Sequence, residues 1–250
     1  MIVKENTYIT PYGLDRTLHI YIPDDYYESD EHYPVMYMYD GHNLFLDQDA
    51  TYGKSWGLEE YLKRSGLPMI IVGLECNHEG EMRLQEFWPY AFTDFHKEHQ
   101  HGTGRVLMRW VVDELKPYID SHYRTLPDRR HTGIGGSSMG GLMSVYTVTA
   151  HNDVFSRAAC LSSSLNFCFK DLMNGIAKSG RLDPDTRIYL SWGSIEAGNR
   201  LAEYTWGNLE VNHLLSQLGA ETYPYLQKKG RHCEADWESQ NEIYMPFLWK

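Results

Sequence analysis

The stretch Gly133-Ile134-Gly135-Gly136-Ser137-Ser138-Met139-Gly140-Gly141 stands between a short extended run and residues 142–151, which have helical length and apolar spacing. It contains the pattern G-x-S-x-G, centred on Ser138. This pattern is typical of a nucleophile elbow, in which a strand turns sharply into a helix and a serine lies exposed at the apex. The glycines two residues before and two after the serine remove side chains that would clash in so tight a turn. The stretch therefore predicts Ser138, rather than its neighbour Ser137, as a catalytic nucleophile.

Two other kinds of glycine-rich turn do not match these residues. A phosphate-binding loop needs the sequence Gly-Lys-Ser/Thr, and no lysine occurs between Arg130 and Lys170. A dinucleotide-binding turn that starts at Gly133 would need a glycine at the position of Ser138. The remaining structural alternative is a tight contact between a helix and a sheet that contains serines by coincidence.

The composition is typical of one globular domain over residues 1–250. Hydrophobic residues make up 42% of the 250 residues, so the chain can bury a full core. The net charge of −11 argues against nucleic acids and anionic membranes as partners. No apolar run has the length of a membrane span, and no signal peptide is visible at the N-terminus. Because no two cysteines have C-x-x-C spacing, we expect reduced thiols in a cytoplasmic protein. The cysteines are Cys76, Cys160, Cys168 and Cys233.

Strand-like and helix-like runs alternate along the chain. This alternation predicts an α/β fold with a mostly parallel central sheet and helices on both faces. Strands are expected at residues 16–23, 33–39, 68–74, 155–162, 187–192 and 221–226, in addition to the strand that leads into the elbow. Helices are expected from residue 55 or 57 to 65, and at residues 105–122, 142–151, 200–218 and 234–248.

Residues 76–104 interrupt this alternation with a long connection. Connections of this length in a compact domain are usually functional or disordered, and this one starts at the sheet edge where Ser138 is expected. Its aromatic residues include Trp88, Tyr90 and Phe95. We therefore predict a lid or pocket wall in which Trp88 contacts substrate, and the alternative is that Trp88 packs into the core. The segment also contains several histidines, but they lack a rigid i,i+4 frame, which favours a solvated loop over a metal site. These histidines are His78, His96, His99 and His101.

A serine nucleophile needs a base, and the base needs an acid that orients it. In the α/β-hydrolase fold these residues follow one another along the chain as serine, acid and histidine. His232 lies in a glycine-containing loop after the last predicted strand, whereas the other histidines that follow Ser138 fall within a predicted helix or at its end. His232 is therefore the predicted base. Glu196 follows the strand at residues 187–192 and is the predicted acid, with Glu203 as its rival.

Two backbone N–H groups must stabilise the oxyanion that forms when a serine attacks a carbonyl carbon. One is expected at Met139, directly after the nucleophile. The second should come from the loop after the strand at residues 33–39, where Gly41 allows a close approach of the backbone. The N–H of His42 is the predicted second donor, with the N–H of Asn43 as the rival. The His42 imidazole is expected to form part of the pocket wall rather than to act as a base. Aromatic residues near the predicted site would suit an aryl or phenolic acyl group, but aromatic walls also bind simple acyl chains. These aromatic residues are Phe45, Trp88, Trp192 and Trp237.

Several further motifs accompany the elbow. They are YDGHNLF at residues 39–45, ELKPYID at 114–120, YRT at 123–125, GGSSMGG at 135–141, DVF at 153–155, and GRH at 230–232 with Trp237. In this set the chain resembles the putative-esterase family of α/β-hydrolases, which is related to esterase D, feruloyl esterases and siderophore esterases. The resemblance implies a carboxylic-ester hydrolase of the α/β-hydrolase fold. It places Ser138 and His232 on the family's nucleophile and base, but many members carry an aspartate as the acid where this chain offers Glu196.

These residues together predict a serine carboxylesterase that works through an acyl-enzyme intermediate. We expect a small-molecule ester as substrate, and no metal or cofactor. Two alternatives share the same fold: an acyltransferase that uses the same three residues, and a catalytically silent binding protein. The presence of all three residues, Ser138, Glu196 and His232, favours an enzyme, because a fold by itself does not imply a function.

Overall fold

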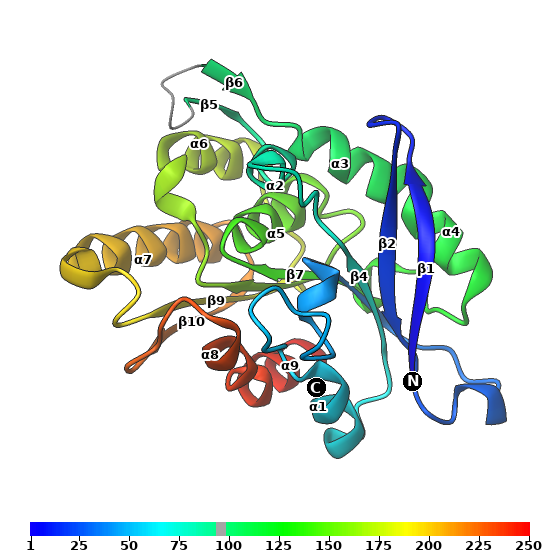
Figure 1. The fold of residues 1–250 in the computed structure, drawn as a ribbon. Coiled ribbons are helices and arrows are strands. Elements are labelled where there is room, and N and C mark those ends of the chain that lie inside the picture. Colours follow the sequence, from blue (N-terminus) through cyan, green and yellow to red (C-terminus); the bar gives the residue numbers. More distant parts are fainter. Residues whose placement is uncertain (94–98) are drawn as a thin grey trace.

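The computed structural model describes residues 1–93 and 99–250, which are drawn in Figure 1. The described residues form an eight-stranded sheet in the order β1-β2-β4-β3-β7-β8-β9-β10. The strands from β4 to β10 in this order run parallel, whereas β2 pairs antiparallel with both β1 and β4. The bounds are Ile2–Ile9 for β1, Leu14–Tyr21 for β2, Val35–Tyr39 for β3, Ile70–Leu74 for β4, Thr132–Ser137 for β7, Arg157–Leu161 for β8, Arg187–Gly193 for β9 and Glu221–Gln227 for β10. The predicted mostly parallel sheet is confirmed.

Helices cover both faces of this sheet (Figure 1). Their bounds are Leu58–Ser65 for α1, Met82–Glu86 for α2, Gly104–Trp110 for α3, Lys116–His122 for α4, Met139–Ala150 for α5, Phe169–Ser179 for α6, Leu201–Gln217 for α7, Glu234–Glu238 for α8 and Asn241–Trp249 for α9. A π-helical segment, Val111–Leu115, joins α3 to α4. None of the helices in the described ranges combines the length and the apolar character needed to cross a bilayer.

The central strands are buried on both faces. In β3, Val35, Tyr37 and Tyr39 belong to the core cluster that also contains residues of α3, α5, α6 and α7. Met36 and Met38 belong to the second cluster, with residues of α1 and α9. Because successive side chains of a strand point to opposite faces, a strand covered by helices on both sides is apolar along its whole length. This two-sided burial accounts for the continuous apolar run in the sequence.

Several elements differ from the prediction. Strand β1 was not predicted, because it is an edge strand whose side chains are mostly exposed or half-buried and form no apolar run. Helix α6 was also missed, since it buries only Leu172 and Ile176. The helix predicted at residues 234–248 is two helices, α8 and α9, which are separated at Ser239 and Gln240.

The long connection over residues 76–104 contains α2 and a small hairpin of β5 (Ala91–Thr93) and β6 (His99–His101). Two ion pairs tie α2 to the sheet. Arg83 binds the carboxylate of Asp40 with N–O distances of 2.6 and 2.7 Å, and Glu86 binds the buried Arg16 at 2.6 Å. The described part of this connection is therefore anchored to the sheet and is not a purely solvated loop. Phe95 and His96, which belong to the same predicted segment, lie outside the described residues.

Candidate active site

The elbow joins β7 to α5 at Ser138. The backbone of Ser138 has φ 58° and ψ −119°, a conformation that residues other than glycine rarely adopt. A side chain at Gly136 would lie 2.9 Å from the backbone of Gly140, and one at Gly140 would lie 3.0 Å from the Cβ of Tyr39. The strand therefore turns into the helix in the tight, strained form that presents a serine at the apex.

The loop after β8 supports this turn. The N–H of Ser138 donates to the carbonyl of Leu161, and the carbonyl of Ser138 accepts from the N–H of Ser164, both at 3.0 Å. The hydroxyl oxygens of Ser138 and Ser164 lie 3.3 Å apart. Sequence reasoning did not assign a role to Ser164. The sequence did contain a signal for this residue, because Ser164 ends a run of three serines at the carboxyl end of a predicted strand. Active sites of parallel sheets form at that edge.

Glu196 and His232 are brought together from the loops after β9 and β10. Oε2 of Glu196 lies 3.2 Å from Nδ1 of His232, and Oε1 accepts the N–H of Gly193 at 2.9 Å. The Glu196 side chain is only 2% exposed, so its carboxylate is held in one place. The two loops are in contact, because the N–H of Ile195 donates to the carbonyl of Gly230 at 3.0 Å. With Nδ1 facing the carboxylate, Nε2 of His232 is the nitrogen left for proton transfer.

The rival acid lies elsewhere. Glu203 is in the first turn of α7, where it is more than half exposed and pairs with Arg200 at 2.8 Å. A carboxylate in that position forms an exposed ion pair and has no hydrogen bond to His232 among the described residues. The geometry therefore favours Glu196 over Glu203.

The backbone N–H groups near Ser138 differ in their hydrogen bonding. The N–H of Asn43 donates to the carbonyl of Asp40 at 2.9 Å within the turn that follows β3. Among the described residues, no acceptor is found for the N–H groups of His42 and Met139. Free donors at these two positions are what an oxyanion requires, which favours His42 over Asn43.

Ser138 and His232 line the same pocket, which has a volume of about 460 Å³. Trp237 forms part of its wall, with its ring 5.2 Å from the ring of His232 and its Nε1 donating to Ser162 at 2.9 Å. Most of the other described wall residues are polar. They include Asp40, Asn43, Thr51, Asn77, His78, Arg83 and Glu234.

The other three aromatic residues predicted to bind substrate lie in the interior. Phe45 belongs to the core cluster with α1 and α9, and Trp88 to the opposite cluster. Trp192 is buried and donates its Nε1 to Thr205 at 3.0 Å. Of the four aromatic residues, Trp237 alone is among the described residues that line the pocket with Ser138. Phe45 and Trp192 are near the predicted site along the chain, but their side chains are buried in the interior.

Charged groups on the pocket wall are held in defined states. Burial opposes ionisation of Asp40, but the charge and hydrogen bonds of Arg83 outweigh it and lower the pKa of this carboxyl. Burial raises the pKa of the Glu234 carboxyl and lowers the pKa of the His42 imidazole. The wall therefore combines an imidazole whose burial disfavours its charged form with an ion pair, which suits a polar ligand.

Replacing Trp88 with alanine is expected to destabilise the fold without changing substrate preference. Its side chain is 7% exposed and packs against the ring of Phe167 at a centroid distance of 5.9 Å. Removing a buried tryptophan costs about 3–5 kcal/mol of unfolding free energy. Chemical denaturation measures this cost, and kcat/KM for several esters measures preference. A reordered preference with little loss of stability would instead make Trp88 a pocket residue.

Comparison with known proteins places this geometry in a family. A family model described as "Putative esterase" matches residues 10–242. The uncharacterized protein YbbA of Bacillus subtilis is 26% identical over 190 residues, which cover 73% of this chain and 69% of YbbA. Ferri-bacillibactin esterase BesA of Bacillus subtilis is 24% identical over 178 residues, which cover 66% of this chain and 60% of BesA. An IroE-like serine hydrolase from Shewanella oneidensis shares the fold, with a TM-score of 0.77, 20% identity, and coverage of 99% of this chain and 80% of that one. The chain therefore belongs to the putative-esterase family, and it is a hydrolase with the α/β-hydrolase fold.

Proposed function

We propose that this protein is a serine carboxylesterase in which Ser138 is the nucleophile, His232 the base and Glu196 the acid. One observation carries the proposal: a serine at a strained elbow shares a pocket with a histidine whose Nδ1 faces a buried carboxylate. A serine hydroxyl is a weak nucleophile unless a base removes its proton, and the base must be correctly oriented. Here His232 is the base that removes the proton of Ser138, and Glu196 orients His232.

The reaction proceeds in two halves. The Oγ of Ser138 attacks the carbonyl carbon of the ester while its proton passes to Nε2 of His232. The carboxylate of Glu196 accepts the Nδ1–H bond and stabilises the imidazolium. The N–H groups of Met139 and His42 bind the negative oxygen of the tetrahedral intermediate. His232 then protonates the leaving alcohol, the C–O bond breaks, and an acyl-enzyme remains. Water, deprotonated by His232, attacks the acyl carbon and releases the acid and Ser138.

The pocket chemistry supports a small polar ester as the substrate. The ion pair of Asp40 and Arg83 and the amides of Asn43 and Asn77 offer hydrogen bonds, and Trp237 and Tyr52 supply aromatic surface. Polar groups placed in this way reject a substrate that cannot bond with them, because they would be left unpaired. Among the relatives, BesA is named as a ferri-bacillibactin esterase.

A panel of esters with one common leaving group tests this proposal. It contains acetyl, hydroxyacetyl, long-chain acyl and hydroxycinnamoyl esters, and kcat/KM is measured for each. We expect the short and hydroxylated acyl groups to be preferred by at least about tenfold over the long-chain ester, since each unpaired polar group costs roughly 1–3 kcal/mol. A preference for the long-chain ester would contradict the proposal that the pocket selects small polar esters. Analysis of products with an added alcohol separates hydrolysis from acyl transfer.

A further inference from the structure

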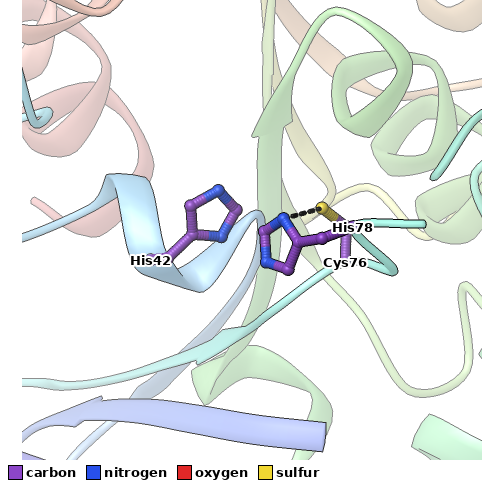
Figure 2. A group of neighbouring side chains, drawn as sticks. All are labelled: His42, Cys76 and His78. Carbon is purple, nitrogen blue, oxygen red and sulfur yellow. Dashed lines mark hydrogen bonds between the residues drawn. The ribbon is translucent and has the colours of Figure 1, made fainter. Parts of the chain in front are cut away.

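Two neighbouring loops place three potential metal ligands together. His42 lies in the turn after β3, and Cys76 and His78 follow β4, the adjacent parallel strand. One ligand atom from each residue lies within 4.8 Å of the other two. The imidazole rings of His42 and His78 meet edge-on at a centroid distance of 4.7 Å, and the sulfur of Cys76 lies 4.0 Å from Nδ1 of His78 (Figure 2).

The bonding of His42 leaves one nitrogen available. The residue is only 6% exposed, and its Nε2 lies 2.9 Å from the hydroxyl of Thr51. Its Nδ1 is buried and has no hydrogen-bond partner among the described residues. A histidine that ligates a metal usually bonds through its other nitrogen to a nearby oxygen, which fixes the tautomer and the ring. Donation from Nε2 to Thr51 would leave the lone pair of Nδ1 free for an ion.

We propose that His42, Cys76 and His78 form a binding site for Zn²⁺ or a similar transition-metal ion. Two imidazoles and one thiolate are a donor set that such ions accept. They would fill three of the four tetrahedral coordination positions, and the fourth would stay open to the pocket. Tetrahedral zinc at ordinary bond lengths requires ligand atoms roughly 3.5 Å apart, so the donors must move closer. His78 is exposed, and rotation of its side chain provides this movement.

The Cys76 thiolate would offset half of the charge of a divalent ion. The Asp40 carboxylate lies on the same pocket wall, and Arg83 already balances it in an ion pair. The thiolate of Cys76 is the species that binds a metal, so binding must release the thiol proton. The affinity should therefore increase with pH.

A bound ion would also affect catalysis, a consequence that rests on the proposed function. His42, Cys76 and His78 line the pocket together with Ser138. An ion there would fill space beside the nucleophile and hold the residue whose N–H is proposed for the oxyanion. We expect Zn²⁺ to inhibit ester hydrolysis and a chelator to restore it.

The site is tested by titrating the chelator-treated full chain with Co²⁺ and then displacing it with Zn²⁺. Co²⁺ bound to a thiolate has a near-ultraviolet charge-transfer band, so this readout needs no substrate and does not depend on the esterase assignment. We expect one ion per chain and a band that Zn²⁺ removes. Absence of the band in the wild-type protein would overturn the site.

Matched variants locate the ligands. Cys76→Ala should abolish the band, and Cys168→Ala, which removes another buried thiol, should leave it unchanged. His78→Ala should weaken binding by at least about tenfold, and His213→Ala, at an exposed position on α7, should not change it. Because His78 is exposed, its variant should fold even if Cys76→Ala does not. Equal binding by His78→Ala and His213→Ala would overturn the proposed ligand set. If Zn²⁺ binds but does not inhibit ester hydrolysis, the metal site stands and only its proposed effect on catalysis is overturned.

Discussion

Ser138→Ala is expected to lower kcat for ester hydrolysis by at least about 10⁴-fold, because it removes the only atom that can form the acyl-enzyme in the proposed mechanism. Substrate should still bind, since the pocket walls and the two N–H donors remain. Hydrolysis of an activated ester measures the loss of turnover, and binding of an unreactive analogue measures the retained pocket. The change is local, because alanine differs from serine only by the hydroxyl and occupies the same strained backbone position.

Ser137→Ala is the matched control for this prediction. Ser137 is the last residue of β7 and is buried, and although it lines the pocket it precedes the strained turn position that Ser138 occupies. Its variant should retain substantial activity, and thermal unfolding of both variants should show that the fold is intact. If Ser137→Ala is the inactive variant, the assignment of the elbow apex is wrong.

Glu196→Gln is expected to lower kcat by roughly 10³–10⁴-fold, with a much smaller effect on KM. Glutamine keeps the size of the side chain and can still accept the N–H of Gly193 through its oxygen. In that orientation it presents an NH₂ group to Nδ1 of His232, which favours the wrong tautomer of the imidazole. It also removes the charge that stabilises the imidazolium. Steady-state kinetics with a saturating ester measures this effect on turnover.

Glu203→Gln provides the comparison, because it removes a carboxylate of the same kind from the neighbouring helix. Glu203 is exposed and pairs with Arg200, and exposed ion pairs contribute little to stability. We expect activity close to that of the wild type. Wild-type activity in Glu196→Gln would remove Glu196 from the proposed site, and a large loss in Glu203→Gln would make Glu203 the acid.

The mostly parallel sheet and the elbow could be predicted because their signals are local. Strands covered on both faces must be apolar along their length, as β3 is, and a serine in a tight turn needs small neighbours such as Gly136 and Gly140. Chain order and strand ends then selected His232 and Glu196 as candidates. An edge strand such as β1 has no comparable signal in the sequence, because its half-exposed side chains follow no apolar pattern.

The sequence alone thus determined the fold class, the family resemblance and a short set of candidate residues. Only the tertiary structure decided which of these candidates meet. It paired Glu196 with His232 and left Glu203 on the surface, and it packed Trp88 into the core. It also brought His42 to Cys76 and His78, although more than thirty residues separate them in the chain. The physical reason is that backbone pattern is set by neighbours in sequence, whereas the direction of a side chain depends on how separate loops pack against one another.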